Sequence, residues 1–278
     1  MRRRGIGFSG VMLAIGLLFL YVPIVLLILF SFNDSRLVTV WGGWSLRWYE
    51  ALFSDQQMLR AAWLSIRIAA ITATIAVVLG TMAGVALVRF GNFRGRFLFT
   101  GMIATPLVMP EVIIGLSMLL MFVAMDQAIG WPAGRGMLTI IIAHATFCAA
   151  YVTVVVQSRL GALDRSLEEA AMDLGARPLK VFFVITLPII APALIAGWLL
   201  AFTLSLDDLV VASFVTGPGA TTLPMLVFSS VRLGVSPQVN ALGSIIVALV
   251  SIGIILATAL MHRRETLRQR DEHMARAG

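Results

Sequence analysis

Uncharged apolar runs of about twenty or more residues alternate along this chain with short segments that carry most of its charges. An α-helix rises about 1.5 Å per residue, so such a run crosses a hydrocarbon core of about 30 Å. The runs predict six membrane-spanning helices, at about residues 11–32, 66–88, 98–124, 138–157, 190–214 and 241–261. Because the runs are continuous, they favour helices over the alternating strands of a β-barrel. We therefore expect an all-α membrane protein forming a single domain, residues 1–278.

The composition supports a membrane protein. Hydrophobic residues make up 59% of the chain and charged residues 13%, against about 45–50% and 25% in soluble domains. This balance excludes an ordinary soluble enzyme. Cys148 is the only cysteine, which excludes an internal disulfide and a multi-cysteine metal site. The net charge of +7 lies between the apolar runs, so it indicates lipid headgroups rather than nucleic acid.

The distribution of basic residues predicts the orientation. Of the 21 Lys and Arg residues, 15 lie on the side of the membrane that holds the N-terminus if all six spans form. Basic residues concentrate in cytoplasmic segments. Both termini are therefore expected in the cytoplasm, with the chain crossing the membrane several times.

The segment between the fourth and fifth spans carries the strongest local pattern. Apolar residues recur there at helical spacing, at Leu163, Leu167, Ala170, Ala171 and Leu174. Ser166 and Glu169 have the spacing of a capping box, which predicts a helix starting at Ser166.

The same segment contains three residues that punctuate helices. Gly175 stands where a left-handed residue ends a helix, and Pro178 can open a second short helix. Pro188 is expected to end that second helix before the next span. From these patterns alone, two interpretations are equally compatible with the two short helices: a surface that another protein approaches closely at Ala170 and Ala171, or a surface loop or interfacial helix without such a role.

A longer pattern decides between these alternatives. Glu169-Ala170-Ala171, three residues, Gly175, nine residues, and then Ile185-Thr186-Leu187-Pro188 resemble the EAA loop of ABC-importer permeases. The resemblance implies a type I ABC-importer permease fold in which residues 161–188 form the cytoplasmic coupling segment. It also implies that Glu169, Ala170, Ala171 and Gly175 dock on a cytoplasmic ATPase and transmit its motion.

Other segments resemble the polyamine branch of that family, closest to the second permease of putrescine transporters. They are Val40–Tyr49, Thr105–Glu111, Ser205–Asp208 and the longer stretch Glu168–Arg232. The resemblance implies a second homologous permease, an ATPase dimer and a periplasmic polyamine-binding protein as partners. One departure is Glu111, which stands where the branch usually has aspartate.

Three acidic residues, Glu111, Asp207 and Asp208, interrupt apolar spans. A carboxylate at mid-bilayer costs roughly 2.5–3.5 kcal/mol, so such groups usually face a bundle interior or a water-filled path. All three are candidate residues of a substrate pathway, with a helix-end or ion-paired role as the alternative. Trp198 and Phe202 share one helix face, and Trp198 is a candidate aromatic wall for a cation, although the pattern favours helix packing.

Other chemistries have weaker support. His144 and Cys148 lie four residues apart, but two ligands are a weak metal signal and packing is favoured, so no metal site is expected. The chain lacks G-x-x-x-x-G-K-[ST], which predicts that ATP and Mg are bound by a partner and that this chain has no cofactor. The alternatives to a permease are an intramembrane enzyme using Asp207 and Asp208, and a passive channel or scaffold.

Overall fold

The computed structural model describes residues 8–37, 40–233, 237–252 and 255, and regular structure in these ranges is almost entirely helical. Among the described residues, five helices are long and apolar enough to cross a membrane, and three shorter apolar helices accompany them. The predicted class, an all-α membrane protein, is confirmed. The chain divides into two compact units, one drawn from Met1–Gln56 and Ser229–Gly278 and the other comprising Gln57–Phe228.

The first unit contains α1 (Phe8–Ser31) and α2 (Arg47–Ser54), joined by a loop that one buried side chain organises. Asn33 donates its Nδ2–H to the carbonyl of Val40, while its Oδ1 accepts the N–H of Gly42. Because a buried amide must find partners, these bonds set the path of the loop.

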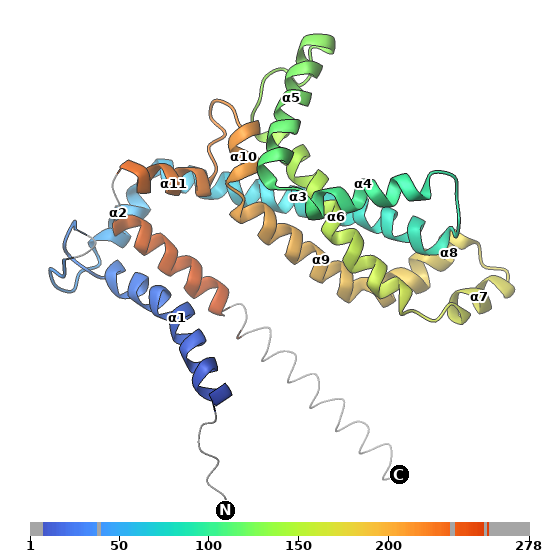
Figure 1. Ribbon diagram of the computed structural model, residues 1–278, viewed down its shortest axis with the longest axis horizontal. Helices are drawn as coiled ribbons and strands as arrows, with labels where there is room; N and C mark the ends of the chain where they lie inside the picture. The colour runs from blue at the N-terminus through green and yellow to red at the C-terminus, as the bar shows by residue number, and fades with distance from the viewer. Residues whose placement is uncertain (1–7, 38–39, 234–236, 253–254, 256–278) are drawn as a thin grey trace, which may run out of the picture. The chain divides into compact units, whose positions relative to one another are not determined.

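The second unit is built on three helices that run side by side, α3 (Gln56–Arg89), α6 (Met137–Gly161) and α9 (Leu187–Asp207) (Figure 1). Of these, α6 is the most enclosed, with 61% of its most apolar window buried. Glycine permits its close approach to α3, since a Cβ on Gly80 would lie 2.7 Å from the Cβ of Val152. The core therefore lies along α6.

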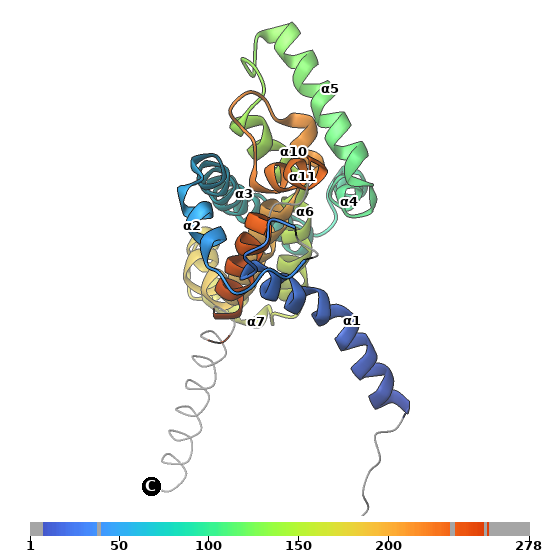
Figure 2. The same cartoon turned by 90° about the vertical axis from the view of Figure 1, so that its left-hand side faces the viewer.

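The third predicted span, residues 98–124, is two helices rather than one. α4 (Arg96–Val108) ends before Met109, and α5 (Glu111–Ile129) begins after Pro110. Pro110 has no N–H to give to a helix and adopts extended angles, φ −58° and ψ 137°. α5 then projects away from the three central helices, in Figure 1 and in the turned view of Figure 2.

The expectation that Pro188 ends a short helix is wrong. α8 (Pro178–Val181), a π-helical turn η1 (Phe182–Thr186) and α9 follow one another without a break, so Pro188 lies inside a continuous helical segment. Pro188 cannot donate a bond to the carbonyl of Val184, and the wider π turn just before it accommodates this interruption.

The fifth predicted span, residues 190–214, is also divided. α9 ends at Asp207, and α10 (Val210–Val215) follows as a separate short helix. After it comes α11 (Leu223–Leu233). The sixth predicted span, residues 241–261, is helical in its described part, within Pro237–Ile252. Residues 253–254 and 256–261 lie outside the described residues.

The close contact of α3 with α6 predicts a sharp difference between two glycines. Gly80→Ala places a methyl group against Val152 and only 3.0 Å from the carbonyl oxygen of Ala149. Overpacking of this kind costs about 1–3 kcal/mol. Thermal unfolding in detergent should show a lower midpoint for this variant. Gly101→Ala on α4, where a Cβ meets nothing within 4 Å, is the matched control. Its midpoint should equal or exceed that of the wild type, because alanine favours the helix over glycine; equal midpoints for the two variants would contradict the packing.

Candidate functional site

The break between α9 and α10 is held by a buried carboxylate. Asp208 leaves the helical conformation, with φ −65° and ψ 125°. Its Oδ2 accepts the N–H of Ala212 at 2.7 Å, and its Oδ1 accepts the N–H of Val211 at 3.3 Å. Asp208 thus caps the first turn of α10, the helix-end role that the sequence left as an alternative.

A histidine on α6 completes this arrangement. The Nε2 of His144 lies 3.1 Å from Oδ2 of Asp208, and its Nδ1 lies 2.7 Å from the hydroxyl of Ser205. All three side chains are buried. Cys148, one turn along α6, directs its thiol to the carbonyl of Ala201 at 3.6 Å. The two α6 residues therefore fasten α6 to α9. Within the described ranges, no three His, Cys, Asp or Glu side chains gather into a possible metal site.

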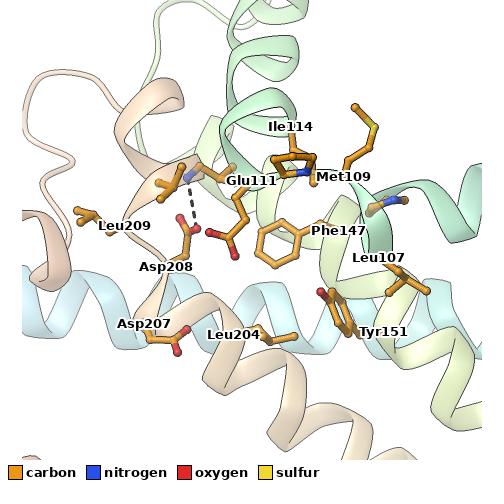
Figure 3. Close-up of a pocket in the computed structure, with 14 residues that line it drawn as sticks. Leu107, Met109, Glu111, Ile114, Phe147, Tyr151, Leu204, Asp207, Asp208 and Leu209 are labelled. Atoms are coloured by element: carbon orange, nitrogen blue, oxygen red, sulfur yellow. Dashed lines mark hydrogen bonds between the residues drawn. The ribbon is translucent and has the colours of Figure 1, made fainter.

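A pocket of about 450 Å³ lies beside this break. It brings together all three acidic candidates, Glu111, Asp207 and Asp208, from α5 and from the end of α9 (Figure 3). The remaining lining residues are apolar or aromatic: Pro106, Leu107, Met109, Pro110, Ile114, Phe147, Tyr151, Leu204, Leu209, Val210 and Val211. The division of the third and fifth spans thus creates the pocket, because its walls come from both breaks.

The acidic side chains of the pocket differ in availability. Asp208 is only 8% exposed and is engaged by His144, whereas Asp207 and Glu111 are exposed. The residues that line the pocket include no arginine or lysine. Figure 3 shows the carboxylate of Glu111 beside the ring of Phe147, with Leu204 between Asp207 and the ring of Tyr151. This arrangement of negative charge and aromatic rings suits an organic cation.

Trp198 lies away from this pocket. Its ring stacks on Phe202 with centroids 5.2 Å apart, as the shared helix face predicted. Its Nε1–H is donated to the hydroxyl of Thr74 on α3, at 3.2 Å. The structure therefore places Trp198 between α9 and α3, and it does not bring it together with the three acidic residues.

The coupling segment forms the predicted helix with a different cap. α7 (Ser166–Asp173) begins at Ser166, as expected. No capping box forms, because Arg165 rather than Ser166 occupies the N-cap position. The N–H of Ser166 is instead donated to Oδ1 of Asp164 at 3.0 Å. This hydrogen bond holds the pKa of the exposed Asp164 carboxyl below its usual value.

The turn after α7 follows the prediction closely. Gly175 has φ +86°, a left-handed conformation that favours glycine. Its N–H bonds to the carbonyl of Met172, and the N–H of Ala176 bonds to the carbonyl of Ala171. This pair of bonds is a Schellman motif. Glu169, Ala170 and Gly175 are exposed and Ala171 is half-buried, so α7 presents a narrow surface of small residues.

Sequence reasoning missed the residue that ties α7 to the other helices. Glu168, next to Glu169, pairs with Arg89 at the end of α3 and accepts a hydrogen bond from Thr186. No local pattern marks Glu168, because it lies about 100° around the helix from Leu167 and its partners lie 79 and 18 residues away in the sequence.

Comparison with known proteins identifies the class of protein to which the chain belongs. The family described as "Binding-protein-dependent transport system inner membrane component" matches residues 76–266. The putrescine transport system permease protein PotI of Escherichia coli (strain K12) is 65% identical over 268 residues, 96% of this chain and 95% of PotI. The spermidine/putrescine transport system permease protein PotC of the same strain is 40% identical over 248 residues, 89% of this chain and 91% of PotC.

A solved structure shares the fold. The crystal structure of a bacterial ABC transporter involved in the import of the acidic polysaccharide alginate aligns with a TM-score of 0.69 at 20% identity. The alignment covers 94% of this chain and 98% of that chain. The chain thus has the fold of an ABC-importer permease, and the family match indicates a transport permease rather than an enzyme. The chain belongs to the family of inner membrane components of binding-protein-dependent transport systems.

The two adjacent aspartates should behave differently in unfolding. Asp208→Asn removes the charge that accepts two backbone N–H groups and faces His144. Loss of such bonds costs about 1–3 kcal/mol, so the thermal midpoint of the purified protein in detergent should fall. Asp207→Asn, at the exposed neighbour, is the matched control and should change stability by about 0.5 kcal/mol or less. A fall of equal size in both variants would show that Asp208 has no special structural role.

Proposed function

We propose that this chain is one of two permease subunits of an ATP-driven importer that carries a polyamine, with putrescine the first candidate, by alternating access. The observation that carries the proposal is the pocket in which Glu111 and Asp207 are exposed beside aromatic rings without a basic lining residue. The substrate named for the 65% identical PotI agrees with that chemistry.

The pocket fits the physical needs of a diamine in transit. An aliphatic diamine carries about two ammonium charges at neutral pH, since alkylammonium groups titrate near the pKa of lysine. Each ammonium must exchange water for other acceptors. Asp207 and Glu111 provide carboxylates from two different helices, and Tyr151 adds a ring face for a cation. Transport also requires weak sites that release the ion, which exposed carboxylates satisfy better than a buried one.

Transport by this mechanism needs other chains. A second homologous permease completes the pathway, a cytoplasmic ABC ATPase dimer binds ATP and Mg, and a periplasmic polyamine-binding protein delivers the substrate. Glu169, Ala170, Ala171 and Gly175 form the surface that docks on the ATPase. The exposure of three of them supports this role, and Ala171 is half-buried. The chain then lies in the inner membrane with both termini in the cytoplasm.

The alternatives have less support. An intramembrane aspartyl enzyme would need two free carboxylates, but His144 and the start of α10 engage Asp208. A passive channel or scaffold would not need a docking helix with the small-residue surface of α7. Neither alternative matches the transport family to which the chain belongs.

The decisive experiment is ATP-dependent uptake of labelled putrescine and spermidine by the complex reconstituted in liposomes. Asp207→Asn and Glu111→Gln should each reduce uptake about tenfold, because each removes a charge-assisted bond of about 1.5–3 kcal/mol. Insertion and ATPase binding should be unchanged. Asp126→Asn, which removes a charge from the same helix as Glu111 but outside the pocket, is the control. Wild-type uptake in both pocket variants, singly and combined, would rule out this pocket as the route.

Bulk on the docking surface should stop transport without preventing insertion. Ala170→Trp adds a large ring to an exposed position on α7, and Gly175→Arg forces a non-glycine residue into φ +86°. We expect both to lose uptake and substrate-stimulated ATP hydrolysis. Asn92→Trp, at an exposed position in the loop between α3 and α4, is the control. Normal stimulated ATPase activity in Ala170→Trp would contradict the coupling role.

A further inference from the structure

A partly buried ion pair joins the coupling helix to the end of α3. The Nη2 of Arg89 donates to Oε1 of Glu168 at 3.1 Å, and its Nε lies 2.9 Å from Oε2 without the alignment of a hydrogen bond. The two side chains are 15% and 12% exposed. An arginine that faces both carboxylate oxygens fixes orientation as well as distance. Glu168 therefore holds the first turn of α7 in one position against α3.

The same carboxylate reaches a third helical segment. The hydroxyl of Thr186, which is buried, donates to Oε1 of Glu168 at 2.6 Å. Thr186 is the last residue of the π turn η1 and directly precedes α9. One side chain thus bonds to the end of α3 and to the start of α9 at once.

Neighbouring contacts strengthen the end of α3. Arg165 donates to the carbonyl of Val88 at 2.6 Å, and Arg96 donates to the carbonyl of Leu87 at 3.1 Å. These carbonyls belong to the last turn of α3, where no further helical N–H is available. Arg165 directly precedes α7, so a second bond from the coupling segment reaches the same turn.

We propose that Glu168 is a positioning residue for energy coupling: it makes the end of α3, the coupling helix α7 and the start of α9 move as one body. The inference rests on the proposed coupling function of α7. From Thr186 the helix continues without a break to Asp207 at the pocket, so displacement of α7 reaches the acidic site along one element. Glu169 and the small residues contact the ATPase, and Glu168 transmits the motion inward.

The test measures substrate imported per ATP hydrolysed in the reconstituted full complex. Glu168→Gln keeps the size of the side chain and removes its charge, and Thr186→Val removes only the hydroxyl. Both should lower this ratio, Glu168→Gln about tenfold, the size of a typical coupling between sites. ATP hydrolysis itself should stay within about twofold of the wild type. A third variant, Arg89→Gln, removes the arginine of the ion pair and should also lower the ratio. Its matched control is Arg94→Gln, which changes an exposed arginine on the loop after α3 and should leave the ratio unchanged.

Combining the variants separates positioning from general damage. Because Arg89 and Glu168 act on each other, Arg89→Gln with Glu168→Gln should lower the ratio no more than either single change. A residue needed only for folding would instead lower assembly, uptake and ATP hydrolysis together. If Glu168→Gln fails to assemble, Thr186→Val decides the matter.

The outcomes distinguish this inference from the proposed function. A wild-type ratio in Glu168→Gln and Thr186→Val, with uptake lost in Ala170→Trp, would overturn the role of Glu168 and leave the coupling role of α7 standing. A wild-type ratio in all three would overturn both. A lowered ratio in Glu168→Gln that the double variant does not worsen supports the inference.

Discussion

The buried carboxylate of Asp208 is the interaction on which the arrangement of the second unit depends. A charge removed from water is costly unless it is paired and hydrogen-bonded. Asp208 meets this condition with His144 on α6 and with two backbone N–H groups of α10. These bonds hold open the break after α9. The break in turn places α10 against α5, where the ring of Phe214 comes so close to Gly115 that a Cβ would lie 2.6 Å from it.

The neighbouring residues Asp207 and Asp208 consequently have different roles, one in binding and one in the structure. Asp208 is turned into the protein and satisfied, so it has little capacity left for a passing cation. Asp207 remains exposed at the pocket with Glu111. A site made only of buried, fully bonded carboxylates would be rigid but unavailable. A site made only of exposed ones would lack a fixed frame. In the adjacent pair, Asp208 fixes the backbone of the site and Asp207 leaves a charge available to a cation.

The sequence predicted what local rules determine and missed what distant partners determine. The start of α7 and the left-handed turn at Gly175 follow from residues within a few positions of each other, so both were predictable. The break at Asp208 depends on His144, 64 residues earlier, which no local pattern reveals. The acidic candidates could be predicted because a charge in an apolar span is conspicuous. The sequence did not predict that Asp208 is buried and bonded while Asp207 and Glu111 stay exposed. Pro188 misled because the π turn before it lets the helix continue.

The length of α3 has a mechanical consequence. Its 34 residues extend about 51 Å, whereas the hydrocarbon core is about 30 Å thick. Even at a tilt of about 40°, near the upper end of the usual range, such a helix outruns the apolar layer. Part of it therefore stands in the headgroup region or in water. Because Arg89 is the final residue of α3, a displacement of that end tilts a stiff helix and moves its other end, about 51 Å away.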